Sequence, residues 1–125
     1  MPSFGTAINC MDGRVQLPVI EYLKNRFNVT YIDMITEPGP NKLLAEQTNP
    51  DLLQRLYEKI NISVNVHESQ MIAVVGHHDC AGNPAPVETQ YFQLQQSVEN
   101  LKLRYPNVGI IPLWVNEHWD VQEID

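Results

Sequence analysis

The sequence predicts an α/β protein, a three-layer domain with a mostly parallel central sheet of about four strands flanked by helices. Short apolar runs alternate along the chain with segments whose apolar residues recur every three to four positions. The connections between these segments are short, which favours parallel strands joined by helices. With 43% hydrophobic and 18% charged residues, 125 residues suffice for one folded domain, residues 1–125, and not for two.

The first predicted strand covers Phe4 to Asn9 and ends at Cys10. Pro18 then stands where the first turn of a helix is expected, a position at which proline costs no hydrogen bond. The helix runs to about Phe27, because its apolar residues form one stripe at helical spacing: Val19, Ile20, Leu23 and Phe27.

The second predicted strand covers Val29 to Ile35, which is rich in β-branched and aromatic residues, and it stops at the turn-rich segment Glu37 to Asn41. A second helix begins with Asn49 as its N-cap and Pro50 as its first residue. Its end stays open, because apolar and polar residues alternate from Ile62 to Val66 and a short strand is a competing interpretation there. The helix presents one apolar face, made of Leu53, Leu56, Tyr57, Ile60 and Val64.

The third predicted strand, Met71 to Val75 with Gly76 at its end, is a compact apolar run typical of a strand buried on both faces. Pro84 and Pro86 keep the next loop open. The strand Val108 to Val115, interrupted by Pro112, is the last central one, and a polar tail follows. Between loop and strand an amphipathic helix is predicted from Tyr91, Leu94, Val98, Leu101 and Tyr105.

Charge and composition exclude several partners. The chain has 8 Lys and Arg against 15 Asp and Glu, a formal charge of -7, and the positive residues are scattered. Nucleic acid and anionic membranes require a concentrated positive patch, so we expect neither as a partner. No apolar stretch approaches the ~20 residues of a spanning helix, and the first residues lack an export signal. We therefore expect a cytoplasmic protein.

Two polar clusters each follow a predicted strand. Cys10, Asp12 and Arg14 lie in Cys-Met-Asp-Gly-Arg, and His77 and Cys80 lie in Gly-His-His-Asp-Cys. In an open parallel sheet, ligands bind beyond the carboxyl ends of the strands where the strand order reverses. If the first and third strands are neighbours, both clusters meet at that point.

The residue types of the clusters favour a metal site. Zinc prefers thiolate and imidazole ligands, and Cys10, Cys80 and one histidine supply three, which leaves one open position. Spacing favours His77 over His78, which we expect to be exposed or adjacent to the site. Asp12 has two open roles: it accepts a hydrogen bond from zinc-bound hydroxide while Arg14 orients it, or it is the fourth ligand.

Bland interpretations remain for single residues. A lone buried cysteine is usually a small core residue, and Asp12 with Arg14 can be an ordinary loop ion pair. Both interpretations are less favoured here, because each of the two cysteines follows a strand and has charged or imidazole side chains nearby. A disulfide is disfavoured in a chain without an export signal. Other polar or aromatic residues are expected on the surface (His67, His118) or in core or interface packing (Trp114, Trp119, Phe4, Tyr31).

Cys-x-Asp-x-Arg after the first strand and Gly-His-x-x-Cys after the third resemble the signature of β-class carbonic anhydrases. The resemblance implies strand order 2-1-3-4, Zn²⁺ held by Cys10, His77 and Cys80, and a catalytic pair of Asp12 and Arg14. It implies a zinc-dependent lyase that reversibly hydrates carbon dioxide to bicarbonate through zinc-bound hydroxide. It also implies a homodimer or higher homo-oligomer.

The chain departs from the family in three places. Relatives have an N-terminal helical arm, whereas the first strand here begins within a few residues of Met1. The loop Thr36 to Asn41 replaces a sequence like Arg-Asn-Ala-Gly-Asn, and Ala81 follows Cys80 where relatives place Gly. The missing arm and the altered loop motivate one alternative, a catalytically silent zinc-binding scaffold with Asp12 as fourth ligand. By analogy with related small proteins that use the same zinc ligands, a hydrolase of carbonyl sulfide or carbon disulfide is a second alternative.

Overall fold

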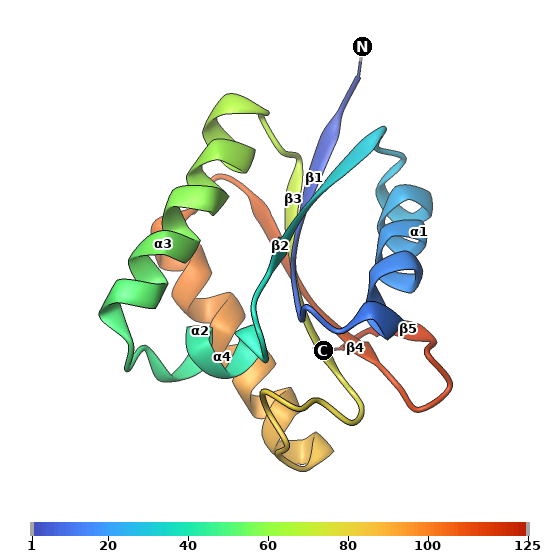
Figure 1. The fold of residues 1–125 in the computed structure, drawn as a ribbon. Coiled ribbons are helices and arrows are strands. Elements are labelled where there is room, and N and C mark those ends of the chain that lie inside the picture. Colours follow the sequence, from blue (N-terminus) through green and yellow to red (C-terminus); the bar gives the residue numbers. More distant parts are fainter. Residues whose placement is uncertain (1, 125) are drawn as a thin grey trace.

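A five-stranded sheet forms the centre of the computed structural model, which describes residues 2–124 (Figure 1). Its strand order is β2-β1-β3-β4-β5. The first four strands are parallel, and β5 runs antiparallel to β4. The predicted α/β class and the order 2-1-3-4 are therefore confirmed, with a fifth strand added at the edge. The strands are β1 (Phe4–Asn9), β2 (Tyr31–Thr36), β3 (Met71–His77), β4 (Gly109–Val115) and β5 (Val121–Glu123).

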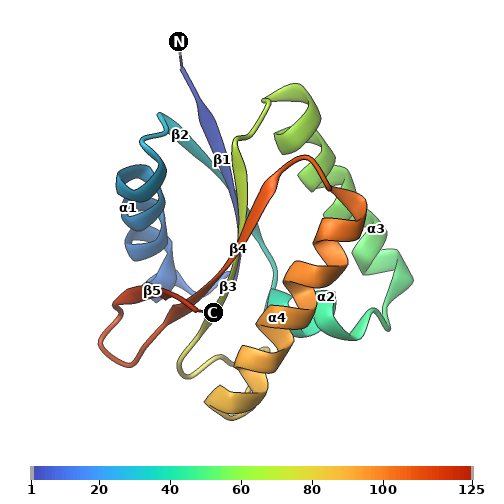
Figure 2. The same cartoon turned by 180° about the vertical axis from the view of Figure 1, so that it is seen from behind.

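Helices cover both faces of the sheet, as predicted. Figures 1 and 2 show α1 on one face and the other α-helices on the opposite face. Each face buries its own apolar cluster, because successive side chains of a strand point to opposite sides. In β3, Ile72 and Val74 join one cluster, and Ala73 and Val75 join the other. The helices are α1 (Gln16–Phe27), α2 (Pro40–Glu46), α3 (Pro50–Asn61) and α4 (Val87–Arg104), with short helices at Gly13–Val15 and Ile62–Val66. None of them, within residues 2–124, is long and apolar enough to cross a membrane.

Strands β1 and β3 are neighbours at the middle of the sheet. Thr6 pairs with Ile72 and Ile8 pairs with Val74. Every residue of β3 is buried, as its continuous apolar run predicts. The two polar clusters therefore follow adjacent strands at the same edge of the sheet. The sequence predicts this arrangement if the first and third strands are neighbours.

The segment after β2 differs from prediction. The sequence predicts a turn-rich loop from Glu37 to Asn41, but helix α2 already begins at Pro40. Gly39 precedes it with a left-handed φ of 58°, a conformation that glycine adopts without steric cost. Pro40 is then a favourable first helical residue, because its missing N–H has no partner at that position.

The segment after α3 is a π-helical turn, Ile62–Val66, and not a short strand. Ser63 in this turn and His67 directly after it contact the same Asp33 carboxylate oxygen, each at 2.7 Å. The His67 ring also stacks on Phe4, with centroids 4.3 Å apart. His67, expected simply on the surface, is thus only partly exposed.

The C-terminal segment is not a free polar tail, because Val121–Glu123 pairs with the end of β4. Strand β4 also continues through Pro112, which pairs with Val74 of β3. The Pro112 carbonyl accepts a hydrogen bond from the Ile124 N–H, so the side of Pro112 that lacks an N–H faces the short edge strand. Proline is tolerated at such a position.

Candidate metal centre

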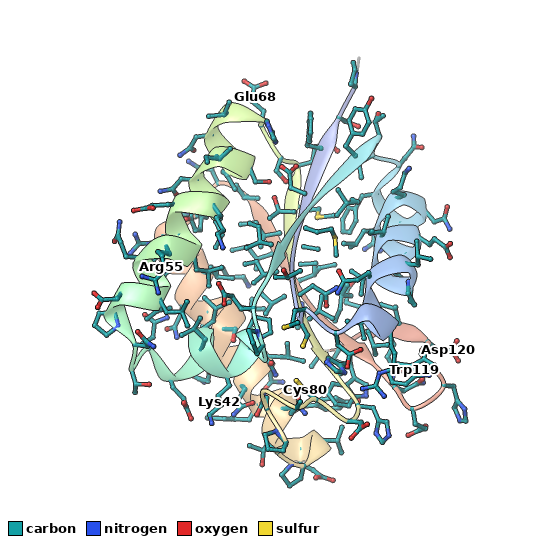
Figure 3. The ribbon with its side chains drawn as sticks, in the orientation of Figure 1. Lys42, Arg55, Glu68, Cys80, Trp119 and Asp120 are labelled. Atoms are coloured by element: carbon teal, nitrogen blue, oxygen red, sulfur yellow. The ribbon has the colours of Figure 1, made fainter. Side chains whose placement is uncertain are left out.

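The ligand atoms of Cys10, His77 and Cys80 lie within 4.8 Å of one another at the carboxyl edge of the sheet. The two sulfur atoms are 3.8 Å apart, and all three residues are buried. Cys10 directly follows β1, His77 ends β3, and a turn returns Cys80 to the same place. Figure 3 labels Cys80 at this edge. The structure thus brings together the three residues that the two sequence motifs select.

His77 has the orientation of a ligand. Its Nδ1 lies 2.7 Å from the carbonyl oxygen of His78, so this nitrogen carries the proton. Nε2 then offers its lone pair, and within residues 2–124 it is a buried side-chain nitrogen without a hydrogen-bond partner. Buried polar atoms in folded proteins are almost always paired. A metal ion at this position satisfies Nε2, so the donor set fits the group that the sequence implies.

The sulfur atoms have unequal acidity. A hydrogen bond from the Cys80 thiol lowers the pKa of Cys10 to about 3, and contacts with His77 and the backbone N–H of Gly39 add to the effect. The same contact raises the pKa of Cys80. Burial lowers the pKa of His77, but the nearby Cys10 sulfur and the His78 carbonyl outweigh it and the net pKa is raised. Two thiolates and a neutral imidazole are a typical zinc donor set, so metal binding would displace the proton that Cys80 shares with Cys10.

Two glycines let the loop after β2 and the loop after Cys80 close on each other. A Cβ atom on Gly39 would lie 2.8 Å from the Asn83 Cβ and 2.9 Å from the Gly82 carbonyl carbon. A Cβ atom on Gly82 would lie 2.7 Å from the Pro38 carbonyl carbon. This close approach brings the Gly39 N–H to the Cys10 sulfur. The unfamiliar loop after β2 is therefore one wall of the centre.

Asp12 and Arg14 form a bidentate ion pair beside the centre. Arg14 Nη2 donates to Asp12 Oδ2 at 2.7 Å and Nε donates to Oδ1 at 3.0 Å, while the Arg14 backbone N–H also donates to Oδ1 at 2.9 Å. These hydrogen bonds lower the pKa of Asp12 to about 2 and raise that of Arg14. Gln16 Nε2 holds the loop by donating to the carbonyls of Cys10 and Asp12, each at 2.8 Å. Both carboxylate oxygens are thus engaged by Arg14.

A cavity of about 220 Å³ opens beside Cys10. Its lining is mostly apolar and includes the Asp12 carboxylate. The lining residues are Cys10, Met11, Asp12, Pro38, Ala81 and Gly82. The cavity therefore adjoins one cysteine of the triad and the Asp12 carboxylate together.

Buried amides support the site, and the sequence interpretation missed them. Asn9 accepts a hydrogen bond from the Cys10 N–H at 2.9 Å. Gln90, 2% exposed, donates to the carbonyls of His77 at 3.4 Å and Asn83 at 3.1 Å. The signal for Gln90 lies in the sequence, since it stands one helical turn before Leu94 on a buried stripe. His78 is exposed, as expected, and lies outside the ligand triad.

Comparison with known proteins gives a family and a fold. A family model described as "Putative carbonic anhydrase" matches residues 1–125. Among solved structures, a carbonic anhydrase from Glaciozyma antarctica has 16% identity and a TM-score of 0.61, covering 100% of this chain and 85% of that one. A β-carbonic anhydrase of the fungal pathogen Aspergillus fumigatus has 10% identity and a TM-score of 0.55, covering 99% and 76%.

A third solved structure comes from a study of two tetrameric β-carbonic anhydrases of Sordaria macrospora. It has 9% identity and a TM-score of 0.55, covering 98% of this chain and 80% of that one. At such identities these likenesses concern the fold. No curated protein matches the chain in sequence.

Proposed function

The chain belongs to the family described as "Putative carbonic anhydrase", and on that premise we propose that it catalyses the reversible hydration of carbon dioxide to bicarbonate. Cys10, His77 and Cys80 would hold one Zn²⁺ ion. Asp12 and Arg14 would form the catalytic pair. The single observation that carries the proposal is that one edge of the sheet holds both the buried triad and the ion pair, with one cavity touching both.

When bound, zinc would lower the pKa of a water molecule and so supply a nucleophile near neutral pH. The protein's own residues have separate tasks. The Asp12 carboxylate, held ionised by Arg14, would accept a hydrogen bond from the attacking water and so orient it. The His78 carbonyl keeps the proton of His77 on Nδ1, which leaves Nε2 free to act as a ligand.

The cavity favours a small uncharged substrate. Apolar groups of Met11, Pro38 and Ala81 line it, and they can pack against carbon dioxide without competing for hydrogen bonds. Negative charge at Asp12 disfavours retention of the bicarbonate product. Carbonyl sulfide and carbon disulfide are linear neutral molecules of the same class, so both are included in the assay below.

The ion pair supports a catalytic rather than a structural role for Asp12. Both of its carboxylate oxygens accept hydrogen bonds from Arg14, at 3.0 and 2.7 Å. A permanent fourth ligand, as in the scaffold alternative, would require at least one oxygen to turn toward the metal. The geometry therefore favours the enzyme over the silent scaffold.

We also propose a homodimer or a higher homo-oligomer built from single zinc-binding domains of residues 1–125. The Sordaria macrospora enzymes of similar fold are described as tetrameric, which supports this assembly. Exposed apolar side chains are present that association can cover, among them Met11 at 62% exposure and Leu17 at 67%.

Stopped-flow measurement of carbon dioxide hydration by zinc-loaded protein, from pH 7 to 9, tests the activity. We expect a rate proportional to protein concentration and well above that of the buffer. Sulfide release from carbonyl sulfide and carbon disulfide, measured in parallel, identifies a preference for carbon–sulfur substrates. A hydration rate that never exceeds the buffer rate contradicts the proposal.

A further inference from the structure

Arg14 has contacts beyond Asp12. Its side chain is 45% exposed, and a half-exposed arginine in water samples many rotamers unless other groups hold it. Here Nη1 donates to the Asp79 carboxylate at 3.3 Å and Nη2 donates to the Asp79 carbonyl at 3.1 Å. The guanidinium carbon also lies 4.6 Å from the centre of the Trp119 ring. Arg14 is therefore held on three sides.

The β4–β5 hairpin holds Trp119 in place. Asn116 Oδ1 accepts hydrogen bonds from the N–H groups of His118 and Asp120 at 2.9 and 3.0 Å, and its carbonyl accepts the Trp119 N–H at 2.9 Å. Trp119 has a φ of 61°, which is unfavourable for a bulky residue. Its ring packs against the apolar cluster that contains Val15. The backbone of the hairpin is thus strained at Trp119, the residue that covers Arg14. Such strain often marks a functional position.

The metal-ligand loop is tied to the same hairpin. The His78 N–H donates to the carbonyl of Val115 at 2.9 Å, where β4 ends. Asp79 follows with a left-handed φ of 58°, which turns both its carbonyl and its carboxylate toward Arg14. Figure 3 shows Trp119 and Cys80 at the same edge of the sheet. The hairpin, the loop of Cys80 and the Asp12–Arg14 pair are therefore mechanically linked.

We propose that Trp119, assisted by Asp79, is a positioning residue that holds Arg14 on Asp12 and thereby keeps the Asp12 carboxylate turned away from the metal. The inference rests on the proposed function, because it assigns these residues to the same reaction. Trp119 lies outside both motifs, and Asp79 occupies a variable position within the second. The indole face acts on the ion pair through Arg14, and its edge also contacts the His78 ring, with centroids 6.4 Å apart. A cation over an aromatic face is attracted by the ring quadrupole, and the flat ring also blocks rotamers that would leave Asp12.

Kinetics of zinc-loaded variants test the proposal. Trp119→Leu keeps a smaller apolar side chain but removes the aromatic face, and we expect kcat for carbon dioxide hydration to fall about three- to five-fold with KM unchanged. Trp119→Phe should retain most of the wild-type kcat. His118→Ala, on the same hairpin with a side chain 75% exposed, is the matched control and should equal the wild type. Zinc content should be one per chain in all of them.

A double-mutant cycle separates positioning through Arg14 from a general structural effect. In the Arg14→Ala background, Trp119→Leu should cause no further loss of kcat. An equal loss in both backgrounds, or a Phe variant as impaired as the Leu variant, overturns the proposal. Asp79→Asn should cause a smaller loss than Trp119→Leu, since the backbone carbonyl still accepts from Nη2; a larger loss would also contradict the assignment of Trp119.

An NMR measurement tests the contact between Trp119 and Arg14 without relying on catalytic activity. The Arg14 Nε–H signal, identified by its absence in Arg14→Lys, should be shifted by the ring current and exchange slowly with solvent in zinc-loaded wild type. Trp119→Leu should abolish the shift and speed the exchange, and Trp119→Phe should preserve both. If the wild type hydrates no carbon dioxide, the proposed function fails, while this signal still decides whether Trp119 holds Arg14. A signal unchanged by Trp119→Leu overturns the inference.

Discussion

Gly39→Ala should loosen the metal centre without touching a ligand. Gly39 has a φ of 58°, and its Cβ atom would lie 2.8 to 2.9 Å from atoms of Asn83 and Gly82. Two of these three contacts are to the Gly82 backbone, which cannot rotate away as a flexible side chain can. The loop after β2 must therefore move away from the loop that carries Cys80.

The magnitude follows from two contributions. An L-residue in the left-handed region costs about 1–2 kcal/mol. Contacts under 3 Å, where carbon atoms prefer about 3.5–4.0 Å, require a shift of several tenths of an ångström, and such overpacking costs about 1–3 kcal/mol. We expect the free energy of unfolding to fall by about 2–5 kcal/mol, a large part of the total stability of a domain of this size.

Urea unfolding of zinc-loaded protein, with an unchanged m-value, measures the loss of stability. A competition assay with a chelator measures zinc affinity, which should also fall because the Gly39 N–H no longer reaches the Cys10 sulfur. Gly109→Ala is the control, because nothing lies within 4 Å of a Cβ atom there, and it should stay within about 0.5 kcal/mol of the wild type. A Gly39→Ala variant as stable as the control would refute the reasoning.

Three further predictions concern the site and the assembly. Asp12→Ala should lower kcat by about 100-fold or more while retaining one zinc per chain; loss of zinc, measured by elemental analysis, would instead indicate a structural ligand. His77→Ala should weaken zinc binding more than about 100-fold by chelator competition, since it removes the buried Nε2; unchanged affinity would exclude His77 as a ligand. Light scattering at micromolar protein should show at least a dimer, and a strict monomer would contradict the proposed assembly.

The sequence predicts those parts of the fold in which one local signal dominates. The apolar run from Met71 to Val75 and the stripe of Leu94, Val98 and Leu101 correspond directly to β3 and α4. The N-cap at Asn49 is confirmed as well, with its side chain accepting from the Leu52 N–H at 3.2 Å. Local patterning suffices at these positions because burial and backbone preference agree.

The missed elements are short or stabilised by distant partners. Helix α2 has seven residues and begins at Pro40, within a proline- and glycine-rich segment that favours a turn. It is held by α4, where Ser97 donates to the Asn41 carbonyl at 2.9 Å. Strand β5 has three residues and exists because β4 offers it an edge. Neither context is visible in a window of local sequence.

The same distinction holds for the site. The two motifs select residues that the fold brings together, namely Cys10, Asp12 and Arg14 with His77 and Cys80. They could be predicted because each motif directly follows an apolar run that is recognisable as a strand. Trp119 packs against an apolar cluster, as expected, but it also lies over Arg14, which is 105 residues away in the sequence. That contact depends on the hairpin that follows β4, so no local pattern predicts it. The hydrogen bond from the Gly39 N–H to the Cys10 sulfur is made by the backbone, so the residue type at position 39 does not predict it.

X-ray absorption at the zinc edge tests the central claim most directly. Zinc-loaded wild type should show two sulfur ligands at about 2.3 Å, one nitrogen at about 2.0–2.1 Å and one oxygen from water, and Asp12→Ala should give the same spectrum. An oxygen ligand lost in Asp12→Ala, or a site with fewer than two sulfur ligands, would contradict the account.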